Sequence, residues 1–156
     1  MKKSPYHGFT LIEIIVSITL LLLLSGFFIA GYNRFNDTQK VQQAASTLVR
    51  NLQAVRTKAA SGNKPAGCDT LVGYTVTFTA DTYTSRALCR VGAVGEINTY
   101  TLPTDVTISA VPSTITFYAL DRGASANQTI TITDVGNTKT VNVSVFTSGV
   151  VSDVVP

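Results

Sequence analysis

The sequence has few of the side chains on which catalysis and metal binding depend. Its only histidine is His7, close to the start of the 156-residue chain. Everything after it therefore lacks the histidine that Ser-His catalysis, Cys-His catalysis and most zinc sites need. Cysteine is limited to Cys68 and Cys89, and two thiolates alone do not supply the four ligands that zinc takes. We expect neither a metal nor a cofactor, and no enzymatic activity.

Charge is also scarce, at 13% of residues, and it is unevenly spread. Residues 34–64 contain six basic side chains and one acidic side chain, Asp37. From Pro65 onward the sequence contains four basic residues and seven acidic ones. The basic segment suits anionic lipid or neighbouring subunits, and equally a solvated helix face. The acidic remainder argues against a general nucleic-acid surface, which needs clustered positive charge.

The chain does contain one long apolar run, over residues 9–31, in which Glu13 is the only charge. A helix of this length spans about 34 Å, enough to cross a bilayer. Lys2 and Lys3 precede the run and would hold this end in the cytoplasm, with the rest across the membrane. Placing a carboxylate in the hydrocarbon of a membrane costs on the order of 3 kcal/mol. The charge of Glu13 is therefore expected to have a function there. Its natural partner is an α-amino group, made by cutting the chain just before Phe9.

The stretch Gly8-Phe9-Thr10-Leu11-Ile12-Glu13 resembles the prepilin peptidase site of type IV pilins and type II secretion pseudopilins. The likeness rests on a short basic leader, the Gly-Phe junction, a glutamate at the fifth residue after the cut, and the unbroken apolar run. It implies that the leader, residues 1–8, is removed at the cytoplasmic face. It implies further that Phe9 becomes the methylated terminus and that Glu13 neutralises the terminus of a neighbouring subunit during filament assembly.

Two simpler interpretations compete with this one. An ordinary secretory signal has an apolar core of about 7–15 residues and an A-x-A-like cleavage site. Here the core is longer, no suitable pair of small residues precedes Tyr32, and Glu13 interrupts the core. A plain membrane anchor explains the length of the run. It leaves Glu13 and the Gly-Phe junction unexplained.

Residues 32–64 continue as a predicted amphipathic stem. Its apolar residues recur at steps of three and four, which is one stripe on a helix. The stripe consists of Val41, Ala45, Leu48, Leu52, Val55 and Ala59. It covers fewer than three heptads, so we expect it to pack on the distal domain rather than form a free coiled coil. Gly62 and Pro65 then end the helix near Ser61.

Residues 65–156 predict a β-rich globular domain. Tyr74, Val76 and Phe78 alternate with threonines, which is the period of a strand. A turn at residues 80–82 leads into a second strand, from Tyr83 to Val91. Further strands are predicted at residues 106–110, 114–119, 129–133 and 140–147. The fold class is therefore α+β, with a long N-terminal helix packed on a C-terminal antiparallel sheet domain. This arrangement is similar to the pilin fold, and more loosely to H-type (GspH/FimT-like) minor pseudopilins and minor pilins.

Cys68 and Cys89 predict one intrachain disulfide. Both lie on the far side of the membrane by the charge argument, where thiols are typically oxidised. If residues 80–82 form the turn, Cys89 lies opposite about Gly73. The loop of residues 69–72 must then fold back for the two sulfurs to meet.

These observations favour a structural subunit, a type IV pilin-like protein of a pilus or a type II secretion pseudopilus. Its expected partners are other pilin or pseudopilin subunits, prepilin peptidase and the cytoplasmic (inner) membrane, with the globular domain periplasmic or extracellular. A minor pilin that binds DNA or a surface is the alternative. DNA-binding FimT-like proteins carry arginines after a C-terminal glycine, whereas Val150, Val151 and Ser152 follow Gly149 here. An anchored enzyme is a third possibility, but Asp69, Asp81, Glu96 and Asp121 show no catalytic spacing.

Overall fold

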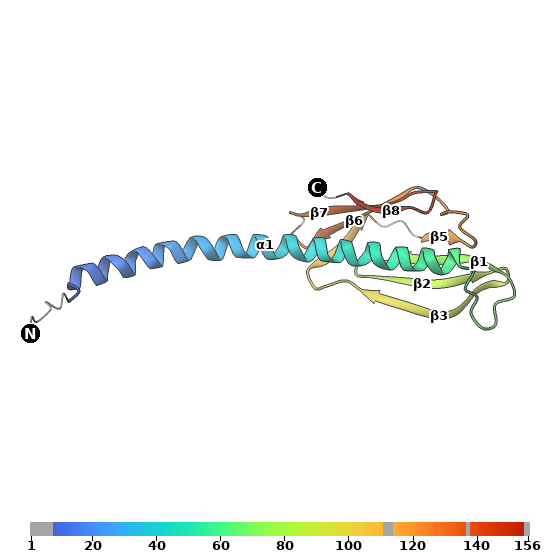
Figure 1. Ribbon diagram of the computed structural model, residues 1–156, viewed down its shortest axis with the longest axis horizontal. Coiled ribbons are helices and arrows are strands. Elements are labelled where there is room, and N and C mark those ends of the chain that lie inside the picture. The colour runs from blue at the N-terminus through green and yellow to red at the C-terminus, as the bar shows by residue number, and fades with distance from the viewer. Residues whose placement is uncertain (1–7, 111–113, 137, 155–156) are drawn as a thin grey trace, which may run out of the picture. The chain divides into compact units, whose positions relative to one another are not determined.

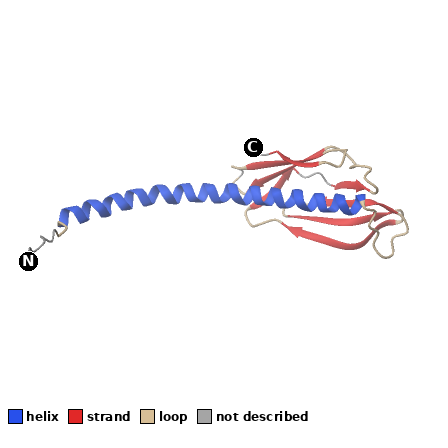
Figure 2. Cartoon of the chain, viewed as in Figure 1, coloured by secondary structure: helices blue, strands red, loops and turns tan. Residues whose placement is uncertain are grey.

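In the residues that it describes, the computed structural model has one helix and eight strands. Figures 1 and 2 show their arrangement. It describes residues 8–110, 114–136 and 138–154, with the side chains of residues 27–34, 110, 153 and 154 outside the description. The chain divides into two compact units, residues 1–36 and residues 37–156. Helix α1, Leu11–Ala60, contributes to both. The predicted helix from Phe9 to about Ser61 agrees with these bounds.

The strands of the second unit form two antiparallel sheets of four strands each. The first sheet has the order β3-β2-β1-β5, and the second has the order β4-β6-β7-β8. The strands of the first sheet are β1 (Leu71–Phe78), β2 (Thr82–Cys89), β3 (Gly92–Thr101) and β5 (Thr114–Tyr118). Those of the second are β4 (Val106–Ala110), β6 (Gln128–Asp134), β7 (Thr140–Val145) and β8 (Val151–Val154). The predicted α+β class, a helix packed on an antiparallel sheet domain, is confirmed.

Two strands were not predicted, and three others have clearly different bounds. Strand β1 begins at Leu71 rather than Tyr74, β2 ends at Cys89 rather than Val91, and β7 also ends early. Strand β3 was not predicted, because Gly95 and Glu96 interrupt its alternation and its pairing with β2 is irregular between Ser85 and Ala87. Strand β8 was not predicted because it has only four residues. Strand β7 ends at Val145 rather than Thr147, because the backbone turns there: Gly149 donates to the carbonyl of Phe146.

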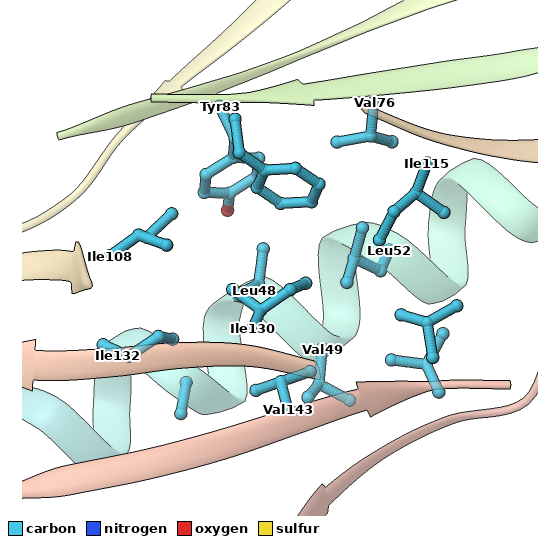
Figure 3. Close-up of a cluster of buried hydrophobic side chains, with 14 of the residues drawn as sticks. Leu48, Val49, Leu52, Val76, Tyr83, Ile108, Ile115, Ile130, Ile132 and Val143 are labelled. Atoms are coloured by element: carbon cyan, nitrogen blue, oxygen red, sulfur yellow. The ribbon is translucent and has the colours of Figure 1, made fainter. Parts of the chain in front are cut away.

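The apolar stripe of α1 is buried in the core, as the sequence predicts. All six of its residues are at most 3% exposed, and Ala44 and Val49 beside them are also buried. In Figure 3, Leu48 and Leu52 lie among side chains of both sheets, with Val76 and Ile115 from the first and Ile130 and Val143 from the second. Each sheet therefore turns one apolar face toward the helix, and the helix closes the core.

The helix ends where the sequence places its stop. Gly62 has a φ of 66°, a left-handed conformation that glycine adopts without steric cost. Its N–H donates to the carbonyl of Ala59 at 3.0 Å, and that of Asn63 donates to Lys58 at 3.2 Å. These bonds satisfy carbonyls that the last turn would otherwise leave open.

A polar contact ties the stem to the first sheet. The ring of Tyr83 is buried in the core and stacks on Tyr100, with ring centres 5.0 Å apart. The side-chain amide of Asn51 donates a 2.7 Å hydrogen bond to the Tyr83 hydroxyl. Burial raises the pKa of Tyr83 above its ordinary value. The Tyr83 oxygen accepts this bond, and burial favours the neutral form of the phenol.

Cys68 and Cys89 are joined in a buried disulfide, with their Cα atoms 5.7 Å apart. The pairing agrees with the sequence prediction, but the strand register that was expected around it is wrong. Cys89 lies opposite Leu71 instead of Gly73, because an irregularity between Leu71 and Gly73 shifts the ladder. The turn is also shorter than predicted, since the backbone N–H of Thr79 donates to the carbonyl of Thr82 at 2.8 Å and leaves only Ala80 and Asp81 between them. Cys89 is thus brought nearer to Cys68, and less of the loop has to fold back.

Replacing Leu48 by alanine should lower the free energy of unfolding by roughly 2–5 kcal/mol, because it opens a cavity where helix and sheets meet. Urea unfolding of the full chain in detergent, followed by circular dichroism, measures this. Gln53→Ala is the matched control on the exposed side of the same helix, and its change should stay within about 0.5 kcal/mol. Equal effects of the two substitutions would contradict the placement of Leu48.

Replacing Cys68 and Cys89 together by alanine should also destabilise the fold. The two cysteines are 21 positions apart, and closing a loop of this size contributes about 3 kcal/mol in the chain-entropy model. The same unfolding assay, with and without reductant, is the measurement. Reductant should lower the stability of the wild-type protein and leave the double variant unchanged. A response of the double variant to reductant would show that the disulfide is not the cause.

Candidate assembly site at the helix start

The first turn of α1 is built on a cap that the sequence analysis did not identify. Thr10 precedes the helix, and its hydroxyl oxygen accepts a 3.3 Å hydrogen bond from the backbone N–H of Glu13. The carbonyl of Thr10 accepts the N–H of Ile14 at 3.2 Å. Threonine at the cap and glutamate three residues later form the pattern of a capping box, so the sequence did carry this signal.

Glu13 lies on the first turn of the helix, and its side chain is exposed. A negative charge there is favoured by the helix dipole, whose N-terminal end is equivalent to a partial positive charge. Glu13 therefore has two roles available to it. Its backbone belongs to the cap, while its carboxylate remains accessible to another group.

The predicted cleavage position lies just outside the helix. Gly8 and Phe9 have no regular secondary structure, and Phe9 is 80% exposed. The peptide bond between them is thus in accessible, non-helical backbone. The remainder of the predicted leader, including Lys2, Lys3 and His7, lies outside the described residues.

The helix after Glu13 is apolar and exposed. Its three hydroxyls are turned back on the helix, where Ser17, Thr19 and Ser25 donate to the carbonyls of Glu13, Ile15 and Leu21. This is the arrangement that the sequence predicts for hydroxyls in an apolar helix. The large aliphatic side chains are each at least half exposed: Leu11, Ile12, Ile14, Ile15, Val16, Ile18, Leu20, Leu21, Leu22, Leu23 and Leu24.

The predicted membrane span, residues 9–31, lies only partly within the description, because the side chains of residues 27–34 are outside it. Within the described residues, no helix combines the length and the apolar character that a membrane crossing requires.

Two acidic residues of the second unit form ion pairs with basic residues of the helix. Asp121 accepts a 3.2 Å contact from Arg56, and Asp105 pairs with Lys40 at the same distance. Hydrogen bonds from the backbone of Lys139 and from Thr138 lower the pKa of Asp134, whose carboxylate caps the turn between β6 and β7. In the part of the chain that the structure describes, no three His, Cys, Asp or Glu side chains gather into a metal-binding group.

Comparison with known proteins points to the same end of the chain. Residues 3–29 match the prokaryotic N-terminal methylation motif. No curated protein and no solved structure matches the chain. The likeness of the distal domain to H-type minor pseudopilins therefore stays a prediction. The match spans the Gly8–Phe9 junction, Glu13 and most of the apolar run, so the chain carries a type IV pilin-like prepilin motif at its N-terminus.

Proposed function

We propose that this protein is a structural subunit, a pseudopilin or minor pilin, that is cleaved between Gly8 and Phe9 and assembled into a filament. The observation that carries the proposal is the prepilin motif on a capped helix whose aliphatic side chains from Leu11 to Leu24 are exposed. The helix of residues 9–31 would anchor the precursor in the cytoplasmic membrane. The globular domain would lie on the far side and reach the cell surface or periplasm in a pilus or a type II secretion pseudopilus.

The apolar side chains need surroundings that keep them from water, either lipid or the helices of neighbouring subunits. Each large aliphatic side chain gains roughly 1.5–3 kcal/mol when it is removed from water. Before assembly lipid would cover these side chains, and in the filament the helices of neighbouring subunits would replace the lipid. Helix–helix packing in an apolar medium is not specific by itself, because the lipid tails are as apolar as the side chains. Register between subunits therefore needs a polar contact.

Glu13 and a new N-terminus at Phe9 would supply this contact. Cleavage places an ammonium group two residues before the start of α1, at the end of the helix dipole that is already positive. In an apolar surrounding this charge is costly unless it is paired. The Glu13 carboxylate of an adjacent subunit would neutralise it and would also remove the cost of leaving Glu13 unpaired.

The first test concerns processing. Intact-mass analysis of the protein extracted from membranes should show the loss of residues 1–8 and the gain of one methyl group on Phe9. Deletion of prepilin peptidase in the host, or a bulky substitution at Gly8, should leave the full-length mass. A mature protein that begins beyond Tyr32 would instead identify an ordinary secretory signal.

The second test separates the charge of Glu13 from the cap. Glu13→Gln keeps the side-chain size and the backbone bond to Thr10 but removes the charge. It should leave insertion and cleavage intact and reduce incorporation into filaments at least tenfold. Thr10→Ala is the matched control, because it removes the cap oxygen and keeps the carboxylate. It should cost about 1 kcal/mol of helix stability with smaller loss of incorporation. Incorporation of the Glu13→Gln protein at the wild-type level would remove the carboxylate from the mechanism.

A further inference from the structure

A cavity of about 370 Å³ lies between the end of α1 and β3, the edge strand of the first sheet. Its apolar lining includes Ala87, which is buried, and Val94, which is half-buried. Four polar side chains line it as well: Lys58 in the last turn of α1, Asn63 just after the helix, and Glu96 and Asn98 on β3. An apolar cavity with a few polar groups is the usual form of a small-molecule site.

The part of the cavity wall that β3 supplies is a bulge. The pairing of β3 with β2 passes from Val94 to Asn98 in four steps, while β2 advances by only two. Residues 95–97 therefore have no partner on β2, and Glu96 is the middle one. Gly95 takes a φ of 87°, which glycine adopts without steric cost. Extra residues of this kind bend a strand locally and are common next to functional sites.

The segment that follows the helix is fixed against the strands by three contacts. The Tyr74 hydroxyl donates a 2.8 Å hydrogen bond to the carbonyl of Asn63, which ties the segment to β1. Pro65 lies close to the bulge, because a Cβ added at Gly95 would be 3.1 Å from the Pro65 Cβ. Cys68, at the end of the segment, is held by its disulfide. The cavity is therefore formed before any ligand arrives, which lowers the cost of binding.

The two charges that line the cavity are unpaired. Neither Lys58 nor Glu96 forms an ion pair or a side-chain hydrogen bond with another described residue. The side-chain amides of Asn63 and Asn98 also make no hydrogen bond to a described residue. One ammonium group, one carboxylate and two amides, each of which both donates and accepts, are thus available to the same ligand.

We propose that this cavity binds a zwitterionic small molecule of dipeptide size. Lys58 binds the carboxylate of the ligand and Glu96 binds its ammonium group, both through charge-assisted hydrogen bonds, which are the stronger kind. The amides of Asn63 and Asn98 bond the peptide group, and an apolar side chain of the ligand rests on Val94. A ligand with only negative charge is repelled by Glu96, and one with only positive charge is repelled by Lys58.

The size of the cavity agrees with such a ligand. Water occupies roughly 30 Å³ per molecule, so the cavity has room for about a dozen groups of that size. A single amino acid leaves part of this space empty, whereas a dipeptide of small residues fills it. The site uses only the end of the helix and the first sheet, so the inference holds whether or not the protein joins a filament.

Isothermal titration calorimetry of the purified full-length protein in detergent is the test, with L-alanyl-L-leucine as the probe. The wild-type protein should bind this dipeptide, and two analogues should bind about tenfold more weakly or worse, because each loses one charge-assisted contact. N-acetyl-alanyl-leucine lacks the ammonium group, and alanyl-leucinamide lacks the carboxylate.

Substitutions assign each charge of the site to one end of the ligand. Glu96→Gln should weaken binding of the free dipeptide about tenfold and abolish its advantage over the acetylated analogue. Lys58→Gln should do the same for the amide analogue. Lys139→Gln is the matched control, an exposed lysine next to β7, and should bind as wild type.

Circular dichroism verifies that the variants are folded, as expected because Lys58 and Glu96 are both exposed. The comparison of the three peptides on the wild-type protein does not depend on the variants. Absence of dipeptide binding overturns the proposal. Equal binding of the three peptides also overturns it, because the charges of the ligand would then not be recognised. Wild-type affinity of both folded variants overturns it as well, since binding would then lie elsewhere.

Discussion

The packing of one helical stripe against two sheets is the contact on which the globular unit depends. Neither sheet has a second apolar layer of its own, and the apolar residues of α1 between Val41 and Ala59 fill the space between them. Leu48 and Leu52 are among the largest fully buried side chains of the unit. Because a buried surface of this kind supplies most of the stability of a small domain, the packing of the two sheets depends on this helix.

The same helix has an opposite character in the first unit. There the large aliphatic side chains from Leu11 to Leu24 are exposed, and Glu13 in the first turn is the only charge among these residues. A helix that is apolar on every side is typical of a segment that other helices or lipid surround. The two parts of α1 thus have different roles. One part completes a core within the chain, whereas the other has its apolar surface available for partners.

Threonine has two roles in the first sheet. Its β-branched side chain favours strand geometry, and its hydroxyl keeps the outer face polar. The register then converts a local preference into an ordered surface, because T-x-T patterns on four strands fall into common rows. Hydrogen bonds between facing residues, such as that of Thr75 with Thr116, reinforce the strand pairing as well.

The sequence by itself determined the features that depend on neighbouring residues. These are the helix with its stripe and its stop at Gly62, the strands with clear alternation, and the motif from Gly8 to Glu13. The Thr10 cap can also be recognised in the sequence from its spacing to Glu13. Only the tertiary structure decided the division into two sheets, the pairing of β1 with the distant β5, and the shift that sets Cys89 opposite Leu71. The physical reason is that strand pairing depends on contacts between residues far apart in the chain. Local alternation fixes which face of a strand is apolar, but not which strand will lie beside it.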